Sequence, residues 1–182
     1  MPPKTHHTSV AAIPPEEVWE PIQVIRRQHD RQLARWMPHV NLLYPFWARD
    51  QFEVVLPGLT QACRQIASFP VTLATFRSFT HRGGRGTIWL DPEPQEAFVA
   101  LQGALQEAFP EFDEQSRFAH GFTPHLSVGQ VATRQAMRGL LTSLQADWTP
   151  VTFRLTEVAL IAREADSPFR IEHRIPLAHE TG

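Results

Sequence analysis

The sequence predicts an α+β fold in which one domain, residues 1–182, is divided into two intimately packed lobes. Two observations support this class. Helical and β-type hydrophobic patterns occur in both halves of the chain, and two β-type runs that contain a Pro-His pair lie at residues 38–42 and 124–128. Each of these runs is followed by a helical pattern and then by two further β runs, so an internal repeat of topology is expected. The length, with 42% hydrophobic and 20% charged residues, is typical of one globular domain.

In the first half, proline and apolar spacing divide the chain into alternating strands and helices. The arginines between residues 26 and 35 are interpreted as the solvated face of the first helix, which has acidic residues in its first turn. The expected elements are a strand at 8–15 that ends at two prolines, a helix at 15–36 that Pro21 interrupts or delays, a strand at 39–46 that ends at Pro45, and a helix at 50–67 that becomes regular near Pro57.

In the second half, a glycine-rich "RGGR" between two β-rich runs is typical of a hairpin connection. Apolar residues spaced by three and four positions then indicate an amphipathic helix. The expected elements are strands at 70–81 and 86–93, a helix at 94–110, a strand at 122–131, a helix at 133–146, and a final strand pair formed by 151–164 and 169–177 around "ADSP".

The two Pro-His runs, "PHVNL" and "PHLSV", carry the candidate site. Side chains alternate along a strand, so His39 shares a face with Asn41, and His125 shares a face with Ser127. The opposite faces are apolar and suit the core. If both strands line one groove, that groove contains two imidazoles and two short hydrogen-bonding groups.

This set of groups suits phosphoester chemistry. A neutral imidazole can accept a proton from an attacking water or hydroxyl, and a protonated imidazole can donate one to a leaving oxygen, because histidine titrates near pH ~6.5. The amide of Asn41 and the hydroxyl of Ser127 could bind non-bridging phosphate oxygens. The residues thus predict His39 and His125 as catalytic, and Asn41 and Ser127 as phosphate-binding.

The runs "PHVNLLYPF" and "FTPHLSVGQ" resemble the paired motifs of the two-histidine (2H) phosphoesterase superfamily, which includes 2′-5′ RNA ligase-like proteins and cyclic phosphodiesterases. The resemblance implies two antiparallel sheets around a central cleft, with helices packed outside. It also implies metal-independent hydrolysis of 2′,3′-cyclic phosphates to 2′-phosphates, without a cofactor, and reversible 2′-5′ ligation as a further activity. By the same resemblance, His125 is the base and His39 the acid, an order that the residues themselves do not set. Asn41 departs from the family pattern, which has Thr or Ser at that position.

Four further residues are candidates for binding the substrate. Tyr44 and Phe122 could stack on a base, although simple alternation places Tyr44 away from the face of His39 and Phe122 suits the core. Arg82 and Arg85 flank the glycines of the hairpin connection and could bind phosphates, or simply form a solvated tip.

Composition restricts the partners. A net charge of −2 gives no global positive field for a long nucleic acid duplex, so RNA ends or small cyclic nucleotides are the expected ligands. The absence of a signal or apolar span predicts a cytoplasmic protein that does not enter a membrane, and a monomer is expected. A metal site is disfavoured because no His-Glu-x-x-His pattern occurs. Two alternatives stay open: a binding module for RNA ends or nucleotides with weak or no turnover because of Asn41, and a 2′-5′ oligonucleotide phosphodiesterase or exonuclease.

Overall fold

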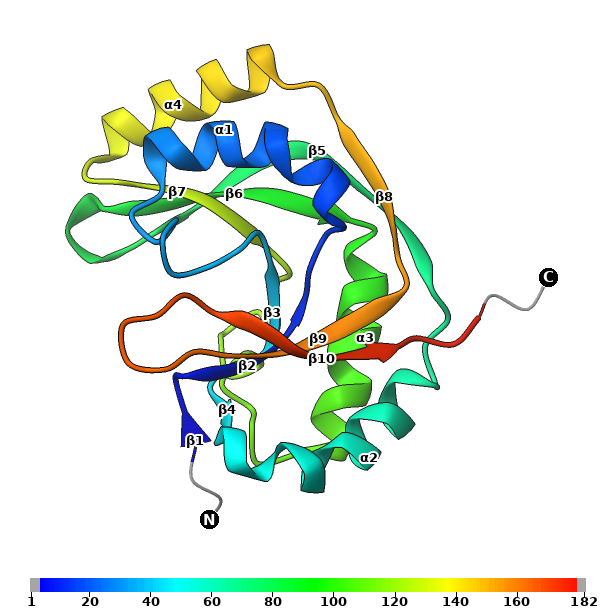
Figure 1. Ribbon diagram of the computed structural model, residues 1–182. Coiled ribbons are helices and arrows are strands. Elements are labelled where there is room, and N and C mark those ends of the chain that lie inside the picture. The colour runs from blue at the N-terminus through cyan, green and yellow to red at the C-terminus, as the bar shows by residue number, and fades with distance from the viewer. Residues whose placement is uncertain (1–3, 180–182) are drawn as a thin grey trace.

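Two four-stranded antiparallel sheets form the framework of the computed structural model, which describes residues 4–179 (Figure 1). The terminal sheet has the strand order β10-β9-β2-β3 and draws its strands from both ends of the chain. The central sheet has the order β7-β6-β5-β8. The strands are β2 (Thr8–Ala12), β3 (Val40–Leu43), β9 (Glu157–Ala162), β10 (Arg170–Pro176), β5 (Phe69–Thr80), β6 (Gly86–Glu93), β7 (Leu126–Val131) and β8 (Val151–Leu155), with a small additional pair β1 (Lys4–Thr5) and β4 (Phe46–Trp47).

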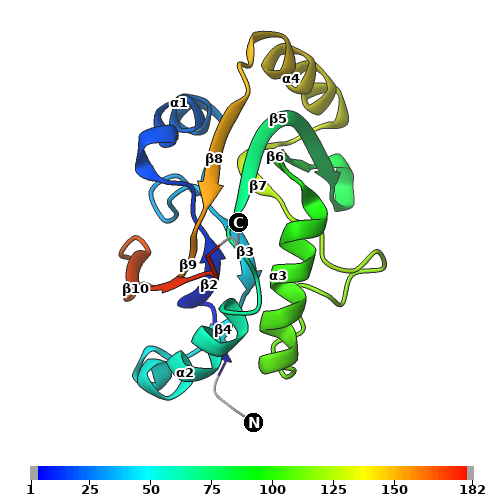
Figure 2. The same cartoon turned by 90° about the vertical axis from the view of Figure 1, so that its right-hand side faces the viewer.

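The four helices reveal the internal repeat. They are α1 (Trp19–His29), α2 (Phe52–Cys63), α3 (Gln95–Ala108) and α4 (Arg134–Asp147). The order β2-α1-β3-α2 is repeated as β6-α3-β7-α4, and β2 pairs with β3 as β6 pairs with β7. Helices α1 and α4 pack on the central sheet, whereas α2 and α3 contact β10 and β3 of the terminal sheet (Figures 1 and 2). Thus α1, which lies between two strands of the terminal sheet along the chain, packs on the central sheet. In the same way α3, which lies between two strands of the central sheet, contacts the terminal sheet.

The predicted α+β class is confirmed, and the last two strands pair as predicted, β9 with β10, but the run that precedes the turn was wrongly predicted as one strand. The run 151–164 is two strands, separated at Thr156. Strand β8 pairs with β5 in the central sheet, whereas β9 pairs with β2 and β10 in the terminal sheet. Because the chain changes sheets at this point, the lobes are not simply its two halves. Each sheet has its own edges, and β3 and β7 lie at one edge of each.

Both helix boundaries near proline also differ from expectation. The first helix ends at His29 rather than residue 36, and it contains Pro21 in its first turn, where the missing N–H has no helical partner in any case. The second helix begins at Phe52, so Pro57 lies inside it and does not delay it. Because the helix ends at His29, residues 30–39 connect it to β3 of the terminal sheet.

The hydrophobic core fills the space between the helices and one face of each sheet. Residues from both lobes belong to one continuous cluster, which includes Val10, Val40, Leu42, Leu43, Leu59, Cys63, Leu73, Ile88, Leu90, Phe98, Leu101, Leu126, Val128 and Leu160. A second, smaller cluster lies on the opposite face of the terminal sheet and contains Ala11, Ala159, Ile161 and Phe169. Because the helices cover the core-facing sides, the opposite faces of the two sheets are available for a site.

Candidate functional site

The two predicted histidines occupy equivalent positions, each immediately before an edge strand. His39 precedes β3 and His125 precedes β7. Each ring is fixed by a contact from Nδ1 to the carbonyl oxygen two residues earlier, 2.7 Å to Met37 and 2.8 Å to Thr123. A carbonyl only accepts hydrogen bonds, so each neutral ring carries its proton on Nδ1 and leaves Nε2 as the acceptor.

A β-bulge follows each histidine at the same distance along the chain. Leu42 interrupts the register between β2 and β3, and Val128 interrupts the register between β6 and β7. Both residues come three positions after the histidine. A bulge adds one residue to one strand and reverses the alternation beyond it. The internal repeat therefore includes the β-bulge, so the two histidine motifs have the same local backbone structure.

The first bulge overturns the simple alternation at Tyr44. Leu42 and Leu43 are both fully buried in the main core, so Tyr44 returns to the face of Asn41. Its ring lies edge-on to Trp36, with centroids 5.3 Å apart, and its hydroxyl donates to the His6 carbonyl at 3.3 Å. Burial raises the pKa of Tyr44, so the phenol stays protonated at neutral pH. The structure thus places Tyr44 beside the first motif.

His39 ends a column of stacked side chains. Its ring stacks on Trp36 with centroids 4.3 Å apart, and Trp36 stacks on Phe169 at 3.9 Å. The Arg163 guanidinium also lies over the Phe169 ring, 5.6 Å from its centroid. Sequence reasoning missed this column because Phe169 lies far from Trp36 along the chain. The column fixes the plane of the His39 ring.

His125 is enclosed by two aromatic rings of the central sheet. Phe79 lies edge-on at 4.9 Å and Trp89 at 5.9 Å, and these two rings stack on each other at 4.8 Å. Ser127 pairs with Trp89 across the β6/β7 ladder. Alternation along residues 86–93 could have indicated Trp89, but only the strand pairing brings it to His125.

Both imidazoles favour the neutral form in this environment. Burial lowers the pKa of His39 to about 4, and the positive charges of Arg26 and His125 act in the same direction, whereas the Met37 carbonyl opposes them. Burial also lowers the pKa of His125, against the Thr123 carbonyl. The charge of His125 thus contributes to the lowered pKa of His39, which places the two rings within electrostatic range of each other.

A buried ion pair holds the segment before His39 against β7. Arg26, interpreted from the sequence as solvated, is 1% exposed, and its Nε donates to Asp30 at 2.7 Å. Its NH2 group donates to the Trp36 carbonyl at 2.9 Å. Asp30 in turn accepts from Gln130 of β7 at 3.0 Å. This chain of contacts connects the loop that carries His39 to the strand that follows His125.

The two short polar residues differ in their partners. The Ser9 hydroxyl donates to Oδ1 of Asn41 at 2.7 Å. With its oxygen occupied, the Asn41 amide has its NH2 group left as a donor. Within residues 4–179 the Ser127 side chain forms no hydrogen bond with another residue. Each motif therefore offers one free donor next to its histidine.

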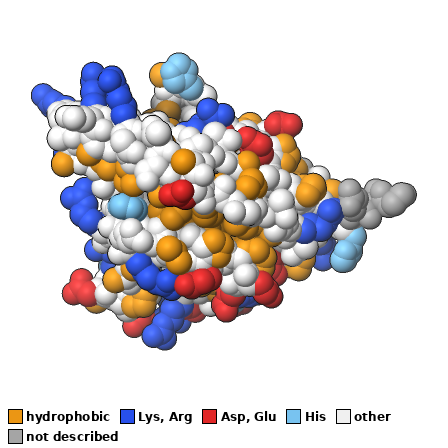
Figure 3. All heavy atoms as spheres, turned by 90° about the horizontal axis from the view of Figure 1, so that it is seen from above, with side chains coloured by type: hydrophobic (Ala, Val, Ile, Leu, Met, Phe, Trp, Pro, Cys, Tyr) orange, Lys and Arg blue, Asp and Glu red, His pale blue; other side chains and the backbone are white. Residues whose placement is uncertain are grey.

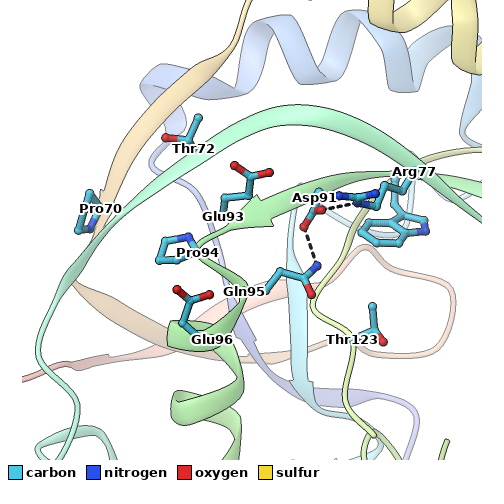
Figure 4. A pocket seen from close by; sticks show the side chains of 10 residues that line it. Pro70, Thr72, Arg77, Asp91, Glu93, Pro94, Gln95, Glu96 and Thr123 are labelled. Atoms are coloured by element: carbon cyan, nitrogen blue, oxygen red, sulfur yellow. Dashed lines mark hydrogen bonds and ion pairs between the residues drawn. The ribbon is translucent and has the colours of Figure 1, made fainter. Parts of the chain in front are cut away.

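A cavity of about 820 Å³ adjoins the His125 half of the site. Its lining includes Trp89 and Thr123, which both contact His125. Asp91, which is 3% exposed, forms an ion pair with Arg77 and accepts from Gln95 at 2.6 Å (Figure 4). The same Gln95 nitrogen reaches the carbonyl of Pro124 at 3.4 Å, directly before His125. Sequence reasoning did not identify this group.

The remaining predicted site residues lie outside the immediate surroundings of the histidines. Phe122 is partly buried and packs against the main core. Arg82 and Arg85 are exposed at the tip of the β5–β6 hairpin. Within the described part of the chain, no three His, Cys, Asp or Glu side chains are grouped to bind a metal ion, and no helix there is long and apolar enough to cross a bilayer.

Comparison with known proteins identifies the family. The family model of the 2′-5′ RNA ligase superfamily matches residues 14–167, which include both histidine motifs. The chain belongs to this superfamily. A Geobacillus kaustophilus (strain HTA426) protein named "Putative phosphoesterase GK0864" is 25% identical over 122 residues, 66% of this chain and 67% of that protein. Membership supports a phosphodiesterase or RNA ligase-like enzyme.

Solved structures share the fold of this superfamily member. TT0787 of Thermus thermophilus superposes with a TM-score of 0.65 at 18% identity, covering 96% of this chain and 99% of that one. E. coli LigT complexed with 3′-AMP gives 0.56 at 17% identity, with coverage of 96% and 99%. E. coli LigT complexed with NADP+ gives 0.59 at 20% identity, with coverage of 98% and 100%. The bilobal arrangement is thus common to these proteins.

Proposed function

We propose that the protein is a metal-independent phosphodiesterase that opens 2′,3′-cyclic phosphates of RNA ends or nucleotides to 2′-phosphates, with reversible 2′-5′ ligation as a related activity. The observation that carries the proposal is the matched anchoring of His39 and His125 through Nδ1, which leaves two Nε2 atoms for proton transfer. The nucleotide complexes of E. coli LigT, which has the same fold, support a nucleotide ligand.

The groups at the site account for each proton in this reaction. His125 accepts a proton from water as the water oxygen forms a bond to phosphorus. The bond from phosphorus to the ribose 3′-oxygen breaks, and that oxygen takes a proton from His39. The amide of Asn41 and the hydroxyl of Ser127 donate to the non-bridging oxygens. The negative phosphate raises the pKa of both imidazoles, so it promotes the protonation that burial disfavours.

A direct assay tests the proposal. The protein is incubated in EDTA with 2′,3′-cyclic mononucleotides, cyclic-ended RNA and 2′-5′-linked oligonucleotides, and products are followed by phosphorus NMR. We expect 2′-phosphates from the cyclic substrates, and a loss of about 10²–10⁴-fold in His39→Ala and in His125→Ala. His120→Ala, which changes an exposed histidine in the loop before β7, is the matched control. Inactivity of the wild type on all three substrate classes would refute the proposal.

A further inference from the structure

Charge is distributed unevenly around the site, although the whole chain is close to neutral. Residues 69–90 and 115–146 contain no Asp or Glu, yet they contain six arginines. These segments include most of the central sheet and nearly all of α4. Four of the arginines, which we call the basic corner, are exposed and lie at the β5–β6 tip and the start of α4: Arg82, Arg85, Arg134 and Arg138.

The basic corner is one surface, because the hairpin tip packs on the helix. A Cβ atom built on Gly84 would lie 3.9 Å from Cγ of Arg134, and one built on Gly86 would lie 2.5 Å from the sulfur of Met137. Arg138 is one helical turn beyond Arg134 and shares its face. Figure 3 shows Lys and Arg side chains projecting at the upper left, the side on which Figure 1 places the tip and the start of α4.

The corner has no internal counter-charge. Among the described residues none of its four arginines forms an ion pair with a carboxylate. The N-terminal end of α4 adds the positive end of a helix dipole. Unpaired arginines at this density repel one another, and a polyanion relieves that repulsion.

The corner is connected to the histidines along one face of the central sheet. Phe79, which contacts His125, is three residues from Arg82, a separation of about 10 Å at strand spacing. Between them, His81 Nε2 lies 2.8 Å from the Thr87 hydroxyl, which faces the same side as Trp89. The partly exposed Phe79 ring is a platform on which a base could stack.

In the opposite direction from His125 the surface is acidic. The cavity beside Trp89 is lined by Asp91, Glu93 and Glu96, with Arg77 as its single cation (Figure 4). Carboxylates there oppose further phosphates but can accept hydrogen bonds from a nucleobase or ribose. The charge therefore distinguishes the two ends of the site.

We infer that the basic corner is a second binding site, which holds the upstream phosphates of a single-stranded RNA whose end reacts at the histidines and whose terminal nucleoside lies over the acidic cavity. This inference rests on the proposed function and specifies its substrate class. The strand runs from the corner past Phe79 to the histidines, a path that a few nucleotides span. A mononucleotide reaches the histidines but not the corner, so a longer RNA gains contacts that a mononucleotide lacks.

Binding tests the inference without relying on turnover. Fluorescence anisotropy measures the affinity of a labelled single-stranded oligoribonucleotide for the wild type and for the triple variant Arg82→Ala, Arg85→Ala and Arg134→Ala. We expect about tenfold weaker binding or more, and a shallower dependence on salt by about 0.7 in log–log slope for each phosphate that the variant no longer binds. The control Arg27→Ala, Arg64→Ala and Arg174→Ala removes the same charge from α1, the end of α2 and β10.

Kinetics separates failure of this inference from failure of the proposed function. The ratio of kcat/KM for a cyclic-ended oligonucleotide to that for a 2′,3′-cyclic mononucleotide should fall by about tenfold in the triple variant, through KM, and stay constant in the control. Unchanged RNA affinity in the triple variant would refute RNA binding at the basic corner. Hydrolysis of the mononucleotide by the same variant would show that the proposed function still holds. Displacement of the RNA by an equally charged polyglutamate, as effectively as by unlabelled RNA, would overturn the assignment to a nucleic acid.

Discussion

Asn41 can serve as a phosphate donor because Ser9 occupies its amide oxygen. A hydroxyl, which the family pattern described above has at this position, would donate directly, whereas an amide could present either its oxygen or its NH2 group. The 2.7 Å contact from the Ser9 hydroxyl to Oδ1 leaves the NH2 group as the free donor. Ser9 of the neighbouring strand β2 therefore determines which end of the Asn41 amide is free.

Substitutions at Asn41 test this role. Asn41→Asp replaces the donor by a negative acceptor, so kcat/KM on the cyclic substrate should fall by about 10²-fold or more. Asn41→Thr keeps a donor and should stay within about tenfold of the wild type. Steady-state kinetics of the two variants on one substrate provides the comparison. Equal activity of Asn41→Asp and the wild type would show that this side chain does not contact the phosphate.

The depressed pKa of His39 predicts how stability depends on pH. The unfolded chain takes up a proton at this histidine near pH 6.5, whereas the folded protein does so only near pH 4. Between these values the unfolded state binds more protons, so the free energy of unfolding decreases as the pH is lowered, by about 1–3 kcal/mol in total.

Urea unfolding at pH 7, 5.5 and 4 measures this dependence. His39→Gln removes the titrating group and should flatten the curve over this range, and His120→Ala, at an exposed site, should not. NMR titration of the His39 ring in the wild type gives its pKa directly. A midpoint near 6.5 in the protein without ligand would contradict the effect of burial.

At the scale of elements, the close approach of α1 to β7 connects the two lobes. A Cβ atom built on Gly129 would lie 2.7 Å from Cβ of His29 and 3.1 Å from its carbonyl oxygen. The Arg26–Asp30–Gln130 contacts begin at this crossing point. The position of the loop that carries His39 therefore depends on a glycine in the strand that follows His125.

Two glycine-to-alanine substitutions distinguish the close packing at Gly129 from the general effect of replacing a glycine by alanine. Gly129→Ala should lower the free energy of unfolding by about 1–3 kcal/mol, because backbone and Cβ atoms of His29 cannot move aside easily. Gly139→Ala, on the exposed side of α4 with no atom within 4 Å of the new carbon, should raise it by about 0.5–1 kcal/mol. Thermal and urea denaturation measure both. Equal effects of the two changes would remove the packing argument.

The parts of the structure that sequence predicts are those fixed by local chemistry. The hairpin around residues 82–85 and the strands after His39 and His125 follow from glycine content and period-two alternation. The exchange of sheets at Thr156 and the stacking of Trp36 on His39 depend on tertiary packing, which leaves no local pattern. The two histidine motifs could be predicted from the sequence for the same reason, because each is a short run of consecutive residues.

At the scale of the whole molecule, both lobes contribute to one core. Leu42 and Leu160 of the terminal sheet belong to the same cluster as Ile88 and Leu126 of the central sheet. The chain also passes between the sheets several times, so neither lobe is a continuous segment. One lobe cannot lose its structure without exposing the apolar surface of the other.

The protein should therefore unfold as one unit. Far-UV circular dichroism and tryptophan fluorescence are expected to give coincident urea transitions, and the slowest-exchanging amides of β2 and β6 should report the same free energy. Two separate transitions, or a difference of several kcal/mol between these strands, would instead show that the lobes are independent domains.

The paired bulges determine where the strands of the site tolerate a change in the number of residues and where they do not. Another apolar residue at Leu42 or Val128 would preserve the ladder, and loss of either residue would keep Tyr44 and Gln130 on their present faces, because Leu43 or Gly129 would then take the core-facing position. An insertion or deletion of one residue between either histidine and its polar partner, Asn41 or Ser127, would instead place these two side chains on opposite faces of the strand. The number of residues between each histidine and its polar partner must therefore remain constant, whereas apolar substitution at the bulge leaves the ladder unchanged.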